Sequence, residues 1–312
     1  MSGPLISLVI PTRKRPERLL QCLDSLCEQT YPREKWEVVL VIDGEDDHIE
    51  PLLANRYSKF PLRIIHQAHS GCGFARNQGA RCAAGQFLVF TDDDCRFPAD
   101  WLARYAERFL QAPERLVAGR AVNALSGNLC SETTQLVIDY LLSHLNSRNE
   151  DASTAIGNNF GVPAQEFRNL GGFGQGYFQI AGAEDRDFAW RWKELGKKIV
   201  FAPELTVYHW HELTLASFVR QHFHYGRGAR LLYDPGANPA HSRPRIQGIG
   251  FYAGLLLRPF SLTKKRAALS ILGLILLSQG AHCVGFLSRG RTPRRKFSPA
   301  SELRPSASEP EQ

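Results

Sequence analysis

The first 110 residues alternate short apolar runs with segments whose apolar residues recur at helical spacing. Nearly continuous apolar runs are typical of strands buried on both faces and predict strands at Leu5–Ile10, Val38–Ile42, Leu62–His66 and Phe87–Thr91. Helical spacing predicts helices at Pro16–Thr30, Gly73–Ala84 and Pro98–Leu110. Strands that alternate with helices predict an α/β fold with a Rossmann-like, mainly parallel sheet flanked by helices. Because ligands of such sheets bind outside the carboxyl ends of the strands, the residues just after each strand are the candidates for chemistry.

The second half of the chain predicts a mixture of strands and helices. Strands are expected at Leu116–Val122, Asn159–Val162, Ile199–Ala202 and Thr206–His211. Helices are expected at Pro163–Leu170, Gly182–Leu195 and Leu213–Leu232. The glycine-rich loop between the first two of these helices lacks the G-x-G-x-x-G spacing of a dinucleotide site. Alternation along a strand places His209 and His211 on one face, where either is a candidate metal ligand or an ordinary packed residue.

Acidic residues follow two of the predicted strands. Asp43 follows the second strand, and Asp92, Asp93 and Asp94 follow the fourth. Two carboxylates about 6 Å apart repel by about 3 kcal/mol at an effective dielectric of about 20, so we expect either a protonated carboxylate or a bound cation. Adjacent oxygen ligands in a strand-end loop suit Mg²⁺ or Mn²⁺. The alternative is a cap for the helix that begins near Pro98, but a cap needs one Asp rather than three.

The composition is that of a globular protein, with 43% hydrophobic and 22% charged residues in a chain of 312. It excludes wholesale disorder and a fibrous repeat. The seven cysteines include no Cys-x-x-Cys pair, so we expect reduced thiols in a cytosolic setting rather than a zinc ribbon or a disulfide framework. At the N-terminus the basic residues follow the apolar stretch, the reverse of a secretory signal, so no export is expected.

The positive charge is concentrated near the C-terminus. The net charge is +7, and nine of the 38 Lys and Arg lie between Arg258 and Lys296, where there is no Asp or Glu. The rest of the chain, with 29 basic and 31 acidic residues, is close to neutral. These basic residues flank apolar runs, a pattern that favours a membrane surface over nucleic acid.

Two apolar stretches in this C-terminal part predict a membrane-associating helical segment. The first, Ile246–Phe260, is short for a membrane span, whereas Ala267–Ser288 has 22 residues without a charge. Positive clusters on both sides favour a helix or re-entrant hairpin that lies in the cytoplasmic leaflet. A true span and a buried core helix remain the alternatives. Residues 290–312, rich in Pro, Ser, Arg and Glu, are expected to form a disordered tail.

Several motifs, in this order, resemble a family-2 glycosyltransferase of the GT-A fold between about Ile6 and Leu232. They are SLVIPTRKRPERL, VLVIDG, GCGFARNQGA, FLVFTDDDC, GNNFGVPAQEFRNLGGF, AGAEDRDFAWRW and VYHWH. The resemblance implies a transferase domain over residues 1–235, with a nucleotide-binding half (1–112) and an acceptor half (113–235). Residues 236–289 would form the membrane-associated segment.

The resemblance also implies the donor side of a site. The donor would be a nucleotide diphosphate sugar, and the cofactor would be Mn²⁺ or Mg²⁺. The nucleotide would be bound by Pro11, Thr12, Arg15, Asp43, Arg76, Asp92 and Asp93. The metal would be held by Asp94, with Asp92 and His209 as further candidates and His211 as a substitute for His209. Gly44 stands where the family usually has a second acid.

On the acceptor side, the resemblance implies that Asp185 is the base that takes a proton from an acceptor hydroxyl. Glu184 is the competing candidate or holds the acceptor. Processive members carry Gln-x-x-Arg-Trp, whereas this chain has Gln221 followed by His-Phe-His-Tyr, so transfer of one sugar is expected. The expected acceptor is lipid-linked or membrane-proximal, at the cytoplasmic face of the inner membrane, as in cell-envelope glycan synthesis. A nucleotidyltransferase acting on a sugar phosphate and a non-catalytic membrane scaffold are the alternatives.

Overall fold

The computed structural model describes residues 5–46, 49–58, 60–174, 183–233 and 247–288. Several predictions fall partly or wholly outside these residues, including the first residue of the helix expected at Gly182–Leu195 and the ends of the segments 1–235 and 236–289. Others are the tail from residue 290, the end of the glycine-rich loop from residue 175, and the start of the first C-terminal apolar stretch at Ile246.

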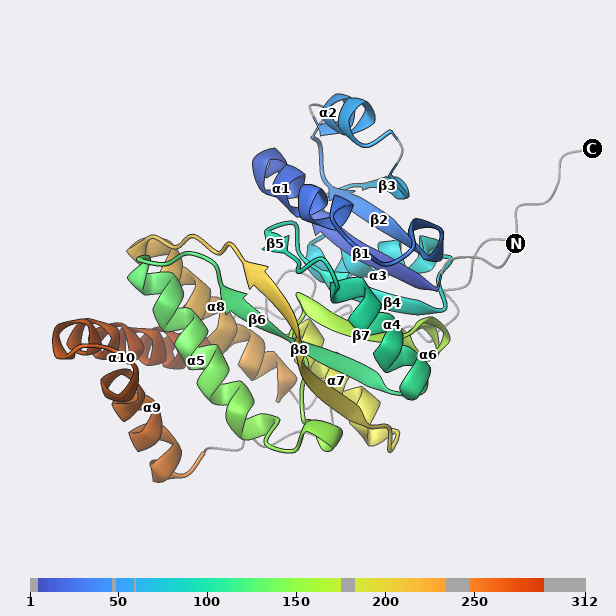
Figure 1. Cartoon of the computed structure of the whole chain (residues 1–312). Helices are drawn as coiled ribbons and strands as arrows, with labels where there is room; N and C mark the ends of the chain where they lie inside the picture. Colours follow the sequence, from blue (N-terminus) through green and yellow to red (C-terminus); the bar gives the residue numbers. More distant parts are fainter. Residues whose placement is uncertain (1–4, 47–48, 59, 175–182, 234–246, 289–312) are drawn as a thin grey trace, which may run out of the picture.

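One sheet in the order β3-β2-β1-β4-β7-β6-β8-β5 forms the centre of the described chain (Figure 1). Its strands are β1 (Ile6–Thr12), β2 (Trp36–Asp43), β3 (Leu62–Gln67), β4 (Phe87–Thr91), β5 (Cys95–Arg96), β6 (Leu116–Asn123), β7 (Asn159–Pro163) and β8 (Ile199–His209). The first four strands are parallel, and β6 is parallel to β8. β7 is antiparallel to β4 and β6, and β5 is antiparallel to β8. The predicted α/β fold with a mainly parallel sheet is confirmed.

The two faces of the sheet are covered by different helices, because alternate residues of each buried strand point to opposite sides. Leu8 and Ile10 belong to one core, beneath α1 (Pro16–Cys27), α2 (Ile49–Arg56) and α4 (Trp101–Gln111). Val9 belongs to the other core, beneath α3 (Cys72–Cys82), α6 (Ala164–Asn169) and α7 (Glu184–Glu194). This burial on both faces explains why the strands are almost continuously apolar.

A group of four helices lies beyond the β6–β8 part of the sheet. They are α5 (Leu129–Leu145), α8 (Leu215–Leu232), α9 (Ile249–Leu262) and α10 (Lys265–Leu287). Within this group α10 contacts α8, α9 and α5, and α5 also contacts β6. Short 3₁₀ turns occur at Arg33–Lys35 and Asn149–Asp151.

The structure differs from the sequence-based elements in several places, one of which is helix α2, which was not predicted. The two strands expected at 199–202 and 206–211 are one strand, β8, whose register shifts opposite Ala118 and Arg120 and which ends at His209. Helix α5 was not predicted, because the residues that it buries include Ser131, Thr133 and Thr134 rather than an apolar stripe. The two-residue strand β5 was also missed, since it depends on pairing with β8.

Candidate active site

The acidic turn after β4 lies at the carboxyl ends of the parallel strands and is tied to β8. The backbone N–H of Cys95 donates to the carbonyl of Asp92 (3.2 Å), which closes the turn. The N–H of Trp210, just past β8, donates to the carbonyl of Asp94 (2.8 Å). The turn that carries the three acids is therefore held between the first half of the sheet and the strand that carries His209.

Basic side chains of the protein itself compensate much of the charge of this turn. Arg15, from the loop after β1, lies 2.6 Å from Asp93 and 2.7 Å from Asp94. Thr12 donates a hydrogen bond to Asp93 (2.7 Å). Burial raises the pKa of Asp93 to about 7. The charge of Arg15 acts to lower this pKa, whereas the charges of Asp94 and Asp92 act to raise it. The expectation of a protonated carboxylate or a bound cation did not consider arginines brought in from other elements, and Arg15 supplies part of the compensation here.

A buried arginine joins the acidic turn to the acid pair of α7. Arg76, on α3, donates to Asp92 (2.6 Å) and to Glu184 (3.1 Å). It is only 3% exposed, and Gly157 makes room for it, since a Cβ there would lie 3.1 Å from the guanidinium. Two groups of carboxylates that are 90 residues apart in sequence thus share one guanidinium and belong to one site.

The two acids at the start of α7 have different surroundings. Glu184 is buried, and its pKa is raised to about 7 by burial and by the charge of Asp185, against the opposing charge of Arg76. Asp185 is half-buried, and one of its oxygens accepts a hydrogen bond from the backbone N–H of Gly157 (2.9 Å). Access to solvent makes Asp185 the better placed of the two to meet an incoming hydroxyl group, whereas Glu184 is enclosed with Arg76.

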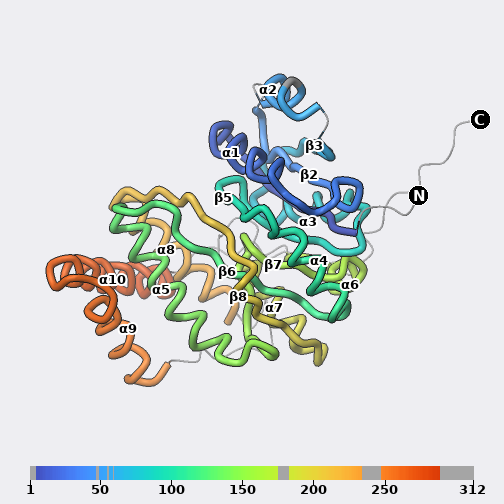
Figure 2. The backbone as a smooth tube through the Cα atoms, viewed as in Figure 1, coloured from blue at the N-terminus to red at the C-terminus, as the bar shows by residue number. Residues whose placement is uncertain are grey.

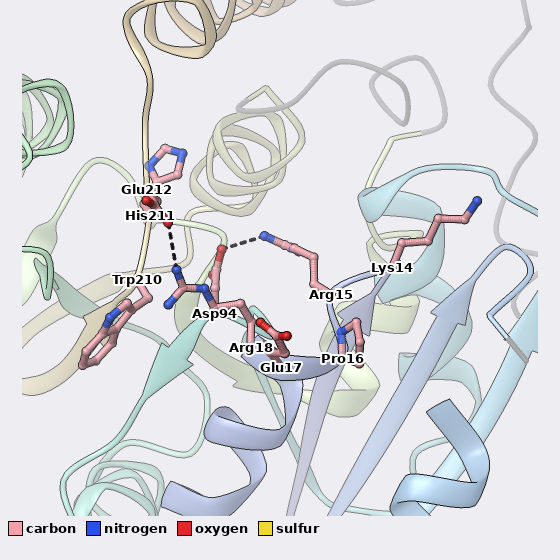
Figure 3. Close-up of a pocket in the computed structure, with 9 residues that line it drawn as sticks. All are labelled: Lys14, Arg15, Pro16, Glu17, Arg18, Asp94, Trp210, His211 and Glu212. Carbon is pink, nitrogen blue, oxygen red and sulfur yellow. Dashed lines mark hydrogen bonds and ion pairs between the residues drawn. The ribbon is translucent and has the colours of Figure 1, made fainter. Parts of the chain in front are cut away.

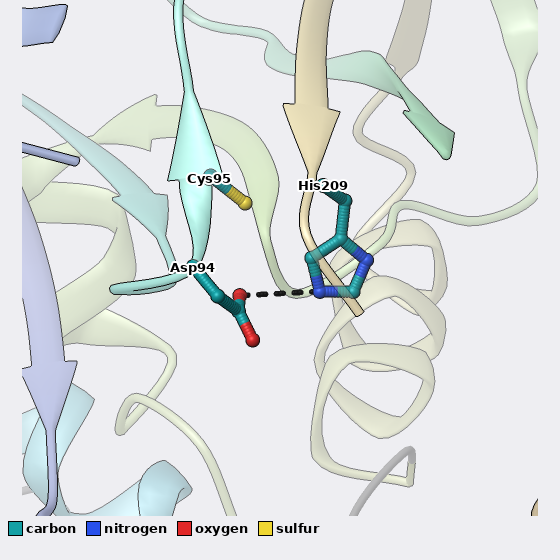
Figure 4. Close-up of side chains that lie close together, drawn as sticks. All are labelled: Asp94, Cys95 and His209. Atoms are coloured by element: carbon teal, nitrogen blue, oxygen red, sulfur yellow. Dashed lines mark ion pairs between the residues drawn. The ribbon is translucent and has the colours of Figure 1, made fainter. Parts of the chain in front are cut away.

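The side chains of Asp94 and His209 are placed as a pair of metal ligands would be (Figure 4). Asp94 Oδ1 lies 3.1 Å from His209 Nε2 and, among the described residues, has no hydrogen bond of good geometry. Two neighbouring ligands at 2.1 Å from an octahedral ion are about 3 Å apart, so the spacing fits Mg²⁺ or Mn²⁺. Burial opposes ionisation of Asp94, but the contact with His209 and the charge of Arg15 hold its pKa below the usual value. Burial acts to lower the pKa of His209, but the contact with Asp94 raises it overall, so the pair offers an ionised oxygen and an imidazole that must release a proton to bind a metal.

Two neighbours of this pair are weaker candidates. The Sγ of Cys95 lies within 4.8 Å of the other two ligand atoms, but Cys95 belongs to the hydrophobic core and burial raises its thiol pKa well above the usual value. The ring of His211 stacks on that of His209 with 5.0 Å between centroids. Burial and the charge of His209 lower the pKa of His211 to about 4, so it is neutral near pH 7. The expected same-side placement of the two histidines is present, although His211 lies beyond the end of β8.

A cavity of about 470 Å³ opens beside Asp94 (Figure 3). It lies between the loop after β1 and the segment after β8, and its lining is Lys14, Arg15, Pro16, Glu17, Arg18, Asp94, Trp210, His211 and Glu212. Lys14 has the left-handed backbone angle φ 52°, which is uncommon for a residue with a side chain. The lining has three basic and three acidic side chains, and two of the basic ones form ion pairs within it, Arg15 with Asp94 and Arg18 with Glu212. Sequence reasoning missed Lys14 and Arg18, although the basic run after the first strand was a usable signal.

Asp43 lies at the end of β2 and is surrounded by donors. Its oxygens accept hydrogen bonds from Gln67, His69 and the backbone N–H groups of Ser70 and Gly71, all at 2.8–3.0 Å. Burial opposes ionisation, but these hydrogen bonds lower its pKa. Asp43 thus fixes the loop that leads into α3, the helix of Arg76. Pro11, in β1, is buried opposite Val41 of β2.

Comparison with known proteins gives this site a family context. Residues 7–167, more than half of the chain, match the family model described as glycosyl transferase family 2. Glycosyltransferase AglE of Haloferax volcanii is 29% identical over 129 residues, 40% of this chain and 40% of that protein. Poly(ribitol-phosphate) beta-glucosyltransferase of Bacillus spizizenii is 30% identical over 103 residues, 32% of this chain and 16% of that protein. The chain thus spans less than half the length of these curated relatives.

A solved structure is similar over most of the chain. The mannosyltransferase PcManGT from Pyrobaculum calidifontis, in complex with GDP-Man and Mn²⁺, superposes with a TM-score of 0.60. The match covers 89% of this chain and 80% of that one at 20% sequence identity. A similarity at this level of identity shows that the two proteins share a fold.

Proposed function

The chain belongs to glycosyl transferase family 2, and on that premise we propose that it transfers one sugar from a nucleotide diphosphate sugar to a hydroxyl acceptor, with inversion and with a divalent metal. The observation that carries the proposal is the Asp92–Arg76–Glu184 bridge. It supports the proposal because it joins the acidic turn to the acid pair, and a reaction between a donor and an acceptor requires both groups to be near each other.

On the donor side, the nucleotide would lie along the ends of β1, β2 and β4. The residues assigned to it are Pro11, Thr12, Arg15, Asp43, Arg76, Asp92 and Asp93. Asp94 and His209 would hold Mn²⁺ or Mg²⁺, which when bound neutralises negative charge that develops on the departing diphosphate. PcManGT, solved in complex with GDP-Man and Mn²⁺, supports a nucleotide sugar and a divalent metal as the ligands. Arg15 and Lys14 at the cavity mouth would bind the diphosphate oxygens.

On the acceptor side, Asp185 would act as the base. The acceptor oxygen attacks the anomeric carbon on the face opposite the diphosphate, and its proton passes to the Asp185 carboxylate. The bond from the anomeric carbon to the diphosphate oxygen breaks, and its electron pair leaves with the diphosphate. Glu184, enclosed with Arg76, would position the acceptor and the base rather than take the proton.

We further propose that the acceptor is lipid-linked or membrane-proximal and belongs to the cell envelope. The name of the Bacillus spizizenii relative, which acts on poly(ribitol-phosphate), supports an envelope polymer as the class of acceptor. The apolar helix α10 supports a location at the cytoplasmic face of the inner membrane, either peripheral or anchored by the segment 236–289. The absence of an Arg-Trp pair after Gln221 supports transfer of a single sugar.

The proposal is tested by ligand binding and donor turnover. We expect one nucleotide sugar to raise the unfolding temperature only with Mn²⁺, since a ligand at about 100 times its Kd adds about 2.7 kcal/mol. Asp94→Asn and Asp185→Asn should each lower nucleoside diphosphate release, whereas Asp100→Asn, on the surface beside Arg104, should not. Full activity of both site variants would refute the assignments. Release of pyrophosphate from a nucleoside triphosphate would indicate a nucleotidyltransferase, and binding without turnover would indicate a scaffold.

A further inference from the structure

Helix α10 is apolar on both of its sides, although within the described part of the chain only one side is packed. Its packed side faces α8, α5 and α9 and buries Ala268, Ile271, Ile275, Ser278 and Gly285. Its outward side exposes Leu269, Leu276, Leu277, Val284 and Leu287, the last of them 74% exposed. A helix at the surface of a soluble protein normally carries polar residues on its outward side. The outward side of α10 therefore needs an apolar partner.

Helix α9 extends this apolar surface. The hydroxyl of Tyr140 on α5 donates to the carbonyl of Phe251 (2.9 Å), and Leu255 packs on Ile271, so α9 is fixed beside α10. Its own exposed side chains are Ile249, Tyr252, Leu257, Phe260 and Leu262. We call the exposed apolar residues of α9 and α10 the outward face. Exposed apolar side chains gathered on two packed helices are typical of an interaction site.

The charges next to the outward face indicate the kind of partner. Residues 247–288 contain no Asp or Glu, and their charged residues are Arg258, Lys264, Lys265 and Arg266. Three of these lie at the turn between α9 and α10, and Arg258 lies one turn of helix before the end of α9. Asp139 of α5 lies near Arg258, so the charge beside the apolar surface is mixed there but positive in total. An apolar surface with net positive charge beside it is complementary to anionic lipid, which combines acyl chains with phosphate headgroups.

The packing of α10 on α8 decides how the outward face could meet a membrane. A Cβ on Gly226 would lie 2.0 Å from the carbonyl oxygen of His282, and one on Gly285 would lie 2.0 Å from that of Phe223. The two backbones are therefore in direct contact. Arg230 also donates to the carbonyls of Leu287 and Ser288, at the end of α10 (3.4 and 3.1 Å).

This packing disfavours α10 as a membrane span, although it is the helix among the described residues long and apolar enough to cross one. If α10 crossed a bilayer in this arrangement, α8 would enter the bilayer with it. Helix α8 carries Arg220, Arg227 and Arg230, and arginine is strongly disfavoured in hydrocarbon. Figure 2 shows α9 and α10 together at one end of the molecule, beyond α5 and α8 and away from β2 and β3.

We propose that α9 and α10 form an in-plane membrane anchor, with the outward face in the acyl boundary and Arg258 and Lys264–Arg266 on anionic headgroups. This inference rests on the proposed function, since an in-plane anchor would explain how a lipid-linked acceptor reaches the site. Helix α8 contacts α10 and carries the half-buried Tyr225, on which the charges of Asp185 and Glu184 act.

Membrane binding is measured on the full chain without turnover, by flotation with vesicles of phosphatidylcholine and phosphatidylglycerol in about equal parts. We expect binding that weakens at high salt. The double variant Leu276→Lys and Leu277→Lys should lower the partition constant at least about tenfold. The matched control Leu195→Lys, at the end of α7 and 60% exposed, should leave it unchanged. Absence of binding would overturn the proposal, and if nucleoside diphosphate release persisted, the proposed function would stand.

Depth measurements distinguish an in-plane anchor from a span. An environment-sensitive fluorophore is attached to Cys283, the exposed cysteine of the outward face, or to Leu269→Cys or Leu276→Cys in a Cys283→Ser background. An in-plane helix predicts the same shallow quenching by spin-labelled lipids at all three positions. Deepest quenching at position 276 would overturn the proposal in favour of a span. A lipid-free dimer that Leu276→Lys dissociates would also overturn it and assign the outward face to a second copy.

Discussion

Replacement of Arg76 by Met should be among the most destabilising changes at the site. Arg76→Met keeps most of the aliphatic stem but removes the guanidinium that donates to Asp92 and Glu184. Removal of one partner of a buried ion pair costs about 3–5 kcal/mol, because the remaining charge stays in a poorly solvated place. Asp92 is partly exposed, and the raised pKa of Glu184 lets it take up a proton near pH 7. Both features favour the lower limit, about 3 kcal/mol.

The assay is urea unfolding followed by the fluorescence of the buried tryptophans, with a surface ion pair as the control. Arg104 and Asp100 lie 2.7 Å apart with 43% and 47% of their side chains exposed, so Arg104→Met should cost no more than about 1 kcal/mol. Glu184→Gln added to Arg76→Met should restore part of the lost stability, since it removes one of the carboxylates that faced the guanidinium. If Arg76→Met and Arg104→Met lowered the urea midpoint equally, the bridge from Arg76 to Asp92 and Glu184 would stabilise the fold no more than a surface ion pair does.

Three further results are expected. Asp94→Asn should weaken Mn²⁺ binding in calorimetry by more than about a hundredfold, whereas Cys95→Ala, in the same cluster, should change it by less than about threefold; equal losses would mean that the thiol is a ligand. Arg15→Gln should strengthen Mn²⁺ binding about tenfold without donor, because it removes a half-exposed cation that competes for Asp94, and unchanged binding would contradict this competition. Burial and Asp185 raise the pKa of Glu184 from 4.5 to about 7, so the folded state holds a proton that the unfolded state loses above 4.5, and stability falls as the pH rises between these values. The unfolding temperature of Glu184→Gln should therefore rise relative to that of the unchanged protein between about pH 5 and pH 8. If the difference between the two unfolding temperatures stayed constant over this range, Glu184 would be ionised throughout.

The local pattern of the sequence predicted most of the first half of the fold. Runs such as Val38–Ile42 and Phe87–Thr91 are buried on both faces, so nearly every consecutive residue in them is apolar and the run can be recognised from the sequence. The position of Asp92–Asp94 after a strand was also visible, because strand ends follow from the same runs. Helix α5 was not predicted because the side that packs on the protein contains Ser and Thr. The burial of these residues depends on hydrogen-bond partners elsewhere in the chain.

The site itself was decided by tertiary structure. The sequence placed acids after strands, but it could not show that Arg15 and Arg76 neutralise them, since the Arg76–Glu184 pair joins residues 108 positions apart. The spacing of Asp94 and His209 depends likewise on the antiparallel pairing of β5 with β8. The same holds for α10. Its composition allowed a span, an in-plane helix or a core helix, and only its glycine-mediated contact with the arginine-bearing α8 favours the in-plane arrangement. Hydrophobic periodicity is a property of neighbouring residues, whereas charge compensation and helix contact depend on which distant residues the fold brings together.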